Sequence, residues 1–346
     1  MKFFHRRPFF MFLLGAALLS GCCLVDEDMS DCGGEQRIDY RLRLVTNWQT
    51  ELATVLPAET DIPVKQALQT YLQGIFTDMA HDDVSLSFYE QDGPRTEHLD
   101  AIVDKDRFDF TYHLPALTLT HTAVANVAAC EGVILEGDAV LTSAKLAQHA
   151  EEDIAPAHRT GLFAGRTTLQ VPANADMRYG MDLTMVNAAT ALVVETADVA
   201  GIDGIRAYAT GFADGFNLAD STWTFTSSPY IRTDDLAVET GTQRCFASVH
   251  FPSRDYRPTR VVEETPDPFQ SENAPDKLWE WHVYASLSDG TVTESVLALS
   301  QPLRAGQLKI LKAKLHDNGV ISVYDTSVGV SVTLDWNQGM GHIIEL

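Results

Sequence analysis

The feature that most constrains the fold is a strict alternation of apolar and polar side chains. In residues 37–44 (RIDYRLRL) every second side chain is apolar, and the pattern returns in residues 279–287 and 328–336. Side chains of a β-strand point alternately to opposite faces, so such a segment buries one face and exposes the other. An amphipathic helix would instead repeat its apolar positions about every 3.6 residues. The chain is therefore expected to consist mainly of strands.

Shorter apolar runs bounded by turn residues predict further strands, namely residues 84–88, 108–112, 124–129, 181–196, 205–213 and 320–324. One helix is expected over residues 61–79. Asp61 can cap it, Pro63 suits its first turn, and the apolar residues that follow recur at helical spacing. The sequence thus predicts an all-β fold with minor α content: two β-sandwich domains in tandem, with the helix covering the first.

Composition divides the 346 residues into four parts. Residues 1–21 are expected to be a signal peptide and residues 22–36 an acidic tether, followed by sandwiches at residues 37–168 and 169–346. The boundary between the sandwiches is placed where a strand-like stretch ends in a Pro and Asn turn and new strand patterns begin. Residues 252–277, rich in Pro, Asp and Glu, predict an exposed loop rather than a third domain.

The first residues have the layout of a secretory signal peptide. Lys2, Arg6 and Arg7 precede an apolar stretch, residues 9–19, that is interrupted by the small Gly15 alone. A spanning helix needs about 20 apolar residues, and this stretch is followed by carboxylates rather than by basic residues. We therefore expect the segment to be cleaved and the mature chain to be exported.

The residues just before Cys22, Leu19-Ser20-Gly21, resemble the lipobox of bacterial lipoproteins. In that family the cysteine is acylated on its sulfur, the signal is cut before it, and the new amine is acylated as well. The resemblance implies that Cys22 becomes the lipidated first residue. Stable anchoring takes two acyl chains, with about 0.8 kcal/mol contributed by each buried methylene, so three hold a protein to a membrane. The alternative is that Cys22 is an apolar residue of the signal peptide.

Carboxylates follow the cysteine at once, at Asp26, Glu27 and Asp28. An acidic run in this position resembles the surface-export signal of Bacteroidota lipoproteins. The resemblance implies a lipid-anchored protein of the outer membrane that is exposed at the cell surface. The composition is equally compatible with a solvated tether whose charges prevent folding.

The other cysteines are Cys23, Cys32, Cys130 and Cys245. With Cys22 acylated, these four remain in an oxidising compartment, where they allow three complete pairings. Our interpretation favours a disulfide between Cys32, at the edge of the first folded domain, and Cys130, which ends an apolar run inside it. Cys245 lies in a strand-like stretch and is expected to be a buried thiol. Cys23 is given no role.

Charge and motifs exclude several classes of function. The formal charge of −23 becomes about −26 when three basic residues leave with the signal, so nucleic acid is excluded as a partner. The sequence has no G-x-S-x-G, H-E-x-x-H or C-x-x-C motif, and its eleven histidines are scattered. Asp214-Gly215 and Asp289-Gly290 are interpreted as turns rather than as calcium loops. We expect no catalytic residue, no cofactor and no metal, and hence no enzyme.

Aromatic side chains raise one alternative, a surface glycan-binding lipoprotein of a nutrient-uptake system. It would share the lipobox and the acidic run, and would stack sugars on tryptophans. The tryptophans are dispersed, however, at Trp48, Trp223, Trp279, Trp281 and Trp336. Trp279 and Trp281 alternate with Val283 and Leu287, which predicts that both pack in a sandwich core.

Three stretches together resemble the FimB-like fimbrial anchor lipoproteins of Bacteroidales. They are residues 22–32 (CCLVDEDMSDC), residues 162–165 (LFAG) with 181–186 (MDLTMV), and residues 329–339 (GVSVTLDWNQG). The likeness covers nearly the whole mature chain. The doubled cysteine and the loop at residues 252–277 depart from the family pattern.

The resemblance implies two transthyretin-like β-sandwich domains, attachment to the outer membrane through Cys22, and a place at the base of a type V pilus. Subunits of this class join by strand addition, in which an extended segment of one chain completes a neighbour's sheet through main-chain hydrogen bonds. The implied partners are fimbrial subunits. The sequence does not identify the edge that is used, and residues 328–336 are expected to be an integral final strand.

Overall fold

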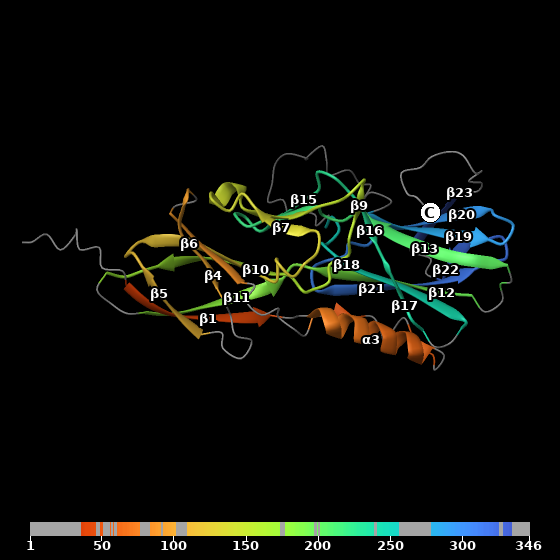
Figure 1. Cartoon of the computed structure of the whole chain (residues 1–346), viewed down its shortest axis with the longest axis horizontal. Coiled ribbons are helices and arrows are strands. Elements are labelled where there is room, and N and C mark those ends of the chain that lie inside the picture. Colours follow the sequence, from red (N-terminus) through yellow and green to blue (C-terminus); the bar gives the residue numbers. More distant parts are fainter. Residues whose placement is uncertain are drawn as a thin grey trace, which may run out of the picture.

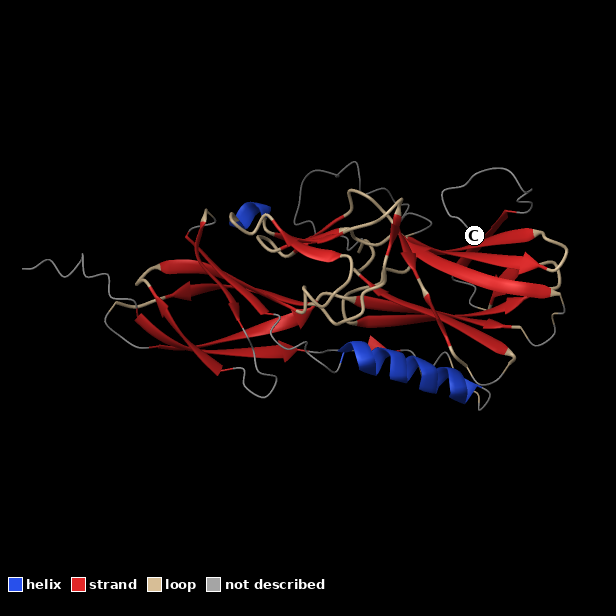
Figure 2. Ribbon diagram, viewed as in Figure 1, coloured by secondary structure: helices blue, strands red, loops and turns tan. Residues whose placement is uncertain are grey.

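The computed structural model (Figure 1) confirms an all-β fold with one α-helix among the residues it describes (Figure 2). It describes residues 36–45, 49–50, 56, 58, 61–76, 84–90, 93–101, 109–173, 177–196, 199, 201–238, 241–255, 278–324 and 328–333. The predicted signal peptide, most of the tether, and nearly all of the loop expected at residues 252–277 lie outside this part of the chain. Two sandwiches follow one another along the long axis (Figure 1).

The amino-terminal sandwich is one sheet of seven strands. Their order is β4(Arg95–Ala101), β3(Val84–Glu90), β6(Thr118–Ala125), β10(Phe163–Gln170), β11(Met177–Met185), β1(Gln36–Val45) and β5(Asp109–Leu114). Because β10 and β11 pair at two positions alone, the sheet folds there into two layers. Leu86 and Leu119 in one layer share a buried core with Ile38 and Leu183 in the other. The strand predicted over residues 37–44 is β1, which pairs with a strand on each side.

The carboxy-terminal sandwich has two sheets. One contains β17(Asp234–Leu236), β18(Gln243–His250), β12(Ala188–Glu195), β21(Gln307–Leu315) and β2(Gln49–Thr50), with β22(Ile321–Val323) also pairing with β21. The other contains β23(Val328–Thr333), β20(Val292–Leu299), β19(Trp279–Leu287), β13(Ile202–Thr210), β16(Tyr230–Arg232) and β9(Ile154–Ala155). Leu192 and Leu311 of the first sheet pack with Trp281 and Val283 of the second.

The hairpin predicted at residues 288–291 joins β19 to β20. Gly290 has a φ of 87°, a conformation that glycine adopts at little cost, and its N–H donates to the carbonyl oxygen of Leu287 at 2.9 Å. The Asp289 carboxylate accepts the Thr291 N–H at 2.8 Å. The Asp-Gly pair is therefore turn chemistry, as predicted.

Helix α3(Ile62–Phe76) covers a different sandwich from the one predicted. The helix lies along the sheet that contains β18 and β12 (Figure 1), and its Val64, Leu68 and Ile75 are buried in a cluster with residues of those strands. The physical reason is that β12 (AATALVVE) is apolar on both faces: Leu192 faces the sandwich core, while Val193 belongs to the cluster beneath the helix. A sheet that is apolar on both faces needs a cover on each.

The boundary predicted between residues 168 and 169 falls inside β10. In addition, β11 pairs in parallel with β1 and so belongs to the amino-terminal sandwich. The stretch 181–196, predicted as one strand, is two strands in different sandwiches, with Val186 and Asn187 between them. Parallel pairing between residues so far apart in sequence leaves no local signal, so alternation alone misplaced the boundary.

The two sandwiches also exchange elements. From the first half of the chain, β2 pairs with β21, β9 pairs with β16, and α3 covers the carboxy-terminal sheet. A further small sheet draws two strands from each half. It contains β15(Thr222–Thr224), β14(Gly215–Asn217), β8(Lys145–Gln148) and β7(Val133–Glu136), with the 3-10 helix η2(Leu141–Ser143) between β7 and β8. The two sandwiches are therefore interlocked by several shared elements and are not connected by a single linker alone.

Candidate functional site

The predicted lipidation and export residues, Cys22 with Asp26, Glu27 and Asp28, lie outside the described residues and stay predictions. The same holds for Cys32 and so for its proposed disulfide. Its proposed partner Cys130 is buried, in a cluster that also contains Val133 and Leu146. Cys245 is a buried free thiol, as predicted, and burial raises its pKa to about 12.

Two tryptophans occupy the sandwich core, as predicted. Trp279 is 1% exposed and Trp281 is fully buried, so neither can stack on a sugar. Trp223 is half-buried and lies 4.6 Å from Phe216 and 5.7 Å from Phe251, measured between ring centroids. Trp48 and Trp336 lie outside the described residues.

In the described part of the chain, no three His, Cys, Asp or Glu side chains are grouped as metal ligands would be. Nor does that part contain a helix with the length and apolarity needed to cross a bilayer. The prediction that the protein is not an enzyme stays a prediction.

Open strand edges are the features at which another chain could add a strand. The described edges of six residues or more are β4, β5 and β23, since the other edge strands, β17, β2, β22, β15, β7 and β9, have four residues or fewer. The edge of β4 is partly closed, because the Arg95 N–H donates to the carbonyl oxygen of Ala139 at 2.8 Å and Pro94 forms a bridge with Val140. β5 begins with Asp109 and is followed by Pro115.

The edge strand β23 differs in its sequence, VGVSVT, which has neither charge nor proline. It pairs with β20 along its whole length, from Val328 opposite Leu299 to Thr333 opposite Glu294. Edge strands that must not pair with another chain are commonly protected by charged residues, proline or a covering segment. Among the long described edges, the β23 sequence carries the fewest such features, and the prediction of an integral last strand is confirmed for residues 328–333.

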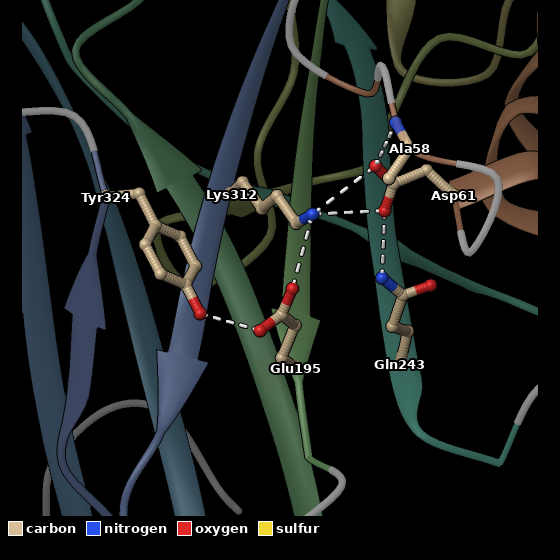
Figure 3. A network of polar contacts seen from close by, with 6 residues as sticks. All are labelled: Ala58, Asp61, Glu195, Gln243, Lys312 and Tyr324. Carbon is tan, nitrogen blue, oxygen red and sulfur yellow. Dashed lines mark hydrogen bonds and ion pairs between the residues drawn. The ribbon is translucent and has the colours of Figure 1, made fainter.

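A buried polar network attaches the start of α3 to the carboxy-terminal sandwich (Figure 3). The fully buried Asp61 carboxylate accepts hydrogen bonds from Lys312 Nζ at 3.1 and 3.3 Å and from Gln243 Nε2 at 3.1 Å. The Ala58 N–H also donates to it, at 3.3 Å. Burial alone would raise the pKa of Asp61, but these donors and the charge of Lys312 outweigh it and lower the pKa. The carboxylate is therefore held charged inside the protein.

Lys312 extends this network across the sheet. Its ammonium lies 3.2 Å from Glu195 Oε1, and the Tyr324 hydroxyl donates to Glu195 Oε2 at 2.6 Å (Figure 3). Burial would lower the pKa of Lys312, yet its hydrogen bonds to Asp61 and Glu195 raise it. Gln243, Glu195 and Lys312 stand on the adjacent strands β18, β12 and β21, so the network ties the helix to three strands at once.

Two further polar links join the halves of the chain. Along α3, the Tyr71 hydroxyl donates to Asp234 Oδ2 at 2.9 Å, and Arg159 Nη2 donates to Asp234 Oδ1 at 2.7 Å. Between the sandwiches, the Asn187 amide donates to His158 Nδ1 at 2.7 Å and its oxygen accepts the Leu162 N–H. Hydrogen bonds thus link the two halves of the chain at two further places.

This network is not predicted by the sequence. Asp61 was expected to cap the helix, and no strand was expected over β21 (QLKILKAKL). Leu308 and Ile310 lie under the helix while Leu311 and Ala313 face the sandwich core, so both faces of β21 are apolar and the alternation is obscured. The local signal is a set of three lysines, Lys309, Lys312 and Lys314, within an apolar strand, since a lysine in such a strand requires a partner.

No protein-family model matches the sequence, and no curated protein matches it. The structure, however, resembles solved structures of Bacteroides and Porphyromonas proteins. A candidate adhesin from Bacteroides ovatus has a TM-score of 0.50 at 11% identity, over 78% of this chain and 84% of that one. A candidate polysaccharide-binding protein from Bacteroides thetaiotaomicron has a TM-score of 0.48 at 11% identity, over 85% and 98%.

The fimbrial anchor protein Mfa2 from Porphyromonas gingivalis has a TM-score of 0.45 at 11% identity, over 86% of this chain and 98% of that one. At such low sequence identities, structural similarity shows a shared fold and nothing about function. The chain shares its multi-sheet β-sandwich fold with the Bacteroides ovatus protein.

Proposed function

We propose that this chain is a lipid-anchored fimbrial subunit, an anchor or accessory protein that attaches a surface fibre to the outer membrane and joins its neighbours by β-strand addition. Its role is structural rather than catalytic. The observation that carries the proposal is the junction at Cys22, where an apolar signal gives way to a lipobox cysteine and then to carboxylates.

The placement of β1 supports this role. The first strand after the tether has eight register pairs with β11 and six with β5. The main-chain hydrogen bonds to the antiparallel β5 run perpendicular to the strands and those to the parallel β11 cross at a slant, so a pull along β1 loads both sets together rather than one bond after another. A chain that enters the fold in this way suits a protein pulled at its amino terminus.

The interlocked sandwiches and the shared fold give further support. A fibre anchor must pass tension from the lipid to its partner, and α3, β2 and β9 each connect the first half of the chain to the carboxy-terminal sandwich. The fold shared with the Bacteroides ovatus candidate adhesin fits a surface protein, although a fold alone does not decide function.

The rival reading, a glycan-binding surface lipoprotein, shares the same anchor. Among the described tryptophans, Trp279 and Trp281 are buried and Trp223 packs against Phe216 and Phe251, so they form no open platform for sugars. The fimbrial role is therefore the better supported of the two.

The anchoring claim is tested by Cys22→Ala, with Cys23→Ala as its matched control. We expect the wild-type protein and Cys23→Ala in the membrane fraction of the source bacterium, and Cys22→Ala in a soluble fraction, because the acyl chains supply the membrane affinity. Immunoblots of fractionated cells measure the distribution. A cleaved Cys22→Ala product that stayed on the membrane would refute lipidation at Cys22.

A further inference from the structure

The proposed anchoring implies that tension enters the fold at its amino-terminal end. We propose that the fold contains two successive mechanical stops, points at which extension of the pulled chain pauses: β1 between β5 and β11, and then the buried network at Asp61. The inference rests on the proposed function for the source of the tension. The two stops themselves are properties of the fold.

The first stop follows from the direction of β1. Its partner β11 runs parallel to it and ends at Met185, next to the carboxy-terminal sandwich, so β1 begins at the far end of the amino-terminal sandwich (Figure 1). A pull on Gln36 away from the second sandwich is directed along the strand. It shears the pairs with both neighbours at the same time, whereas a sideways pull would break them in sequence.

The second stop follows from the location of α3. After β1 the chain meets the carboxy-terminal sandwich first at β2, whose two residues pair with β21, and then at Asp61, at the start of the helix. A pairing of two residues is short, so the buried network at Asp61 is the stronger of these two attachments. There the carboxylate is bonded to Lys312 and Gln243, which belong to β21 and β18 (Figure 3). The pull therefore passes directly into the second sandwich.

Burial makes this second stop resistant. Withdrawing Asp61 would leave the Lys312 ammonium, whose side chain is 21% exposed, without its buried counter-ion. The rest of the helix is held as well, by the Tyr71 hydroxyl on Asp234 and by the Gly161 N–H on the carbonyl oxygen of Ile75 at 2.8 Å. Helix and sheet thus stay together after β1 has left.

The two stops predict a measurable step. The chain from Gln36 to Asp61 extends when β1 has been drawn out and the short pairing of β2 has broken, and these 26 residues correspond to roughly 85–95 Å of added contour length, before the folded distance between the two ends is subtracted. The next extension begins at a separate force peak, when the Asp61 network breaks.

Single-molecule force spectroscopy tests the proposal, on the full chain with Cys22→Ala and handles at its two ends. We expect two early events separated by the predicted step. Asp61→Asn should abolish the pause at Asp61, so that one longer release replaces the two. A single release in the parent protein, or unchanged steps in Asp61→Asn, would overturn the proposal.

Two variants of β1 separate the first stop from general damage. Asp39→Pro removes a main-chain N–H from the strand, and should lower the force of the first event at least twofold without moving the second. Asp39→Asn keeps that N–H and should leave both events unchanged. Equal first-event forces in these two variants contradict a stop at β1.

This experiment and the fractionation test fail independently. A protein that shows both force events but is soluble in cells retains the stops and loses the anchoring function. A membrane-bound protein that unfolds in one release retains the anchor and loses the stops. Far-UV circular dichroism spectra show that each variant is folded before it is pulled, so that the loss of a force event cannot be ascribed to misfolding.

Discussion

His158 shows how single side chains hold the junction between the sandwiches. Its Nδ1 accepts a hydrogen bond from the Asn187 amide, and its Nε2 donates to Gln148 Oε1 at 2.6 Å. This arrangement needs the neutral ring, since protonation of Nδ1 would remove the acceptor. His158 is fully buried, as are His121 and His250, and burial lowers their pKa values to about 3, 4 and 3 respectively.

These histidines predict acid destabilisation. Their pKa values lie below the ordinary 6.5, so between about pH 6.5 and pH 4 the unfolded chain binds more protons than the folded one. These buried neutral histidines therefore stabilise the fold fully above about pH 6.5, and the free energy of unfolding should fall as the pH is lowered below that value. Urea unfolding at about pH 7.5, 6 and 4.5 measures the slope.

His282 has the opposite effect on the pH dependence of stability, but it is one histidine against three. Burial lowers its pKa, but hydrogen bonds to Glu280 and Glu294 outweigh burial and raise it. The stabilisation that His282 contributes to the folded state is present below about pH 6.5 and is lost as the pH rises through its pKa in the folded protein. His158→Gln should reduce the overall acid slope. Unfolding free energies that stay level or rise towards about pH 4.5 contradict this account.

At the scale of elements, strands whose sequences alternate between apolar and polar residues were the easiest to predict. Residues 37–44 and 279–287 alternate clearly and are the strands β1 and β19. The strand β21 is apolar on both faces and was not predicted. The prediction of which sandwich α3 covers was wrong for a related reason: the sequence of a strand does not tell which element covers it.

The attachment of α3 predicts an asymmetry between two aspartates. Asp61→Asn should lower the free energy of unfolding by about 1–3 kcal/mol, because the half-buried Lys312 ammonium loses its buried counter-ion and keeps Glu195 as its remaining carboxylate partner in the network. Asp39→Asn is the matched control: the Asp39 side chain is 42% exposed and pairs with Arg37, so its loss should cost less than about 1 kcal/mol. Urea unfolding curves of both variants measure the difference. Equal losses would mean that the network does not stabilise the helix.

At the scale of the whole molecule, the sequence predicted the class and the tandem sandwiches but not how they interlock. The boundary near residue 168 was wrong because β11 pairs with β1, which lies far away in sequence. The elements α3, β2 and β9 cross from one half to the other through contacts that local patterns do not encode. The lipidation motif at Cys22 is local, so it can be proposed from the sequence and stays a prediction, whereas the Asp61 network depends on residues 251 positions apart.

The central claim is that this chain attaches a fibre to the outer membrane, and purification of the native protein from surface membranes tests it most directly. Mass spectrometry of the purified complex should find an acylated Cys22 at the amino terminus and a ladder of fimbrial subunits bound to the same molecule. A protein recovered without acyl chains and without fimbrial subunits, or bound to a polysaccharide instead, would contradict the account.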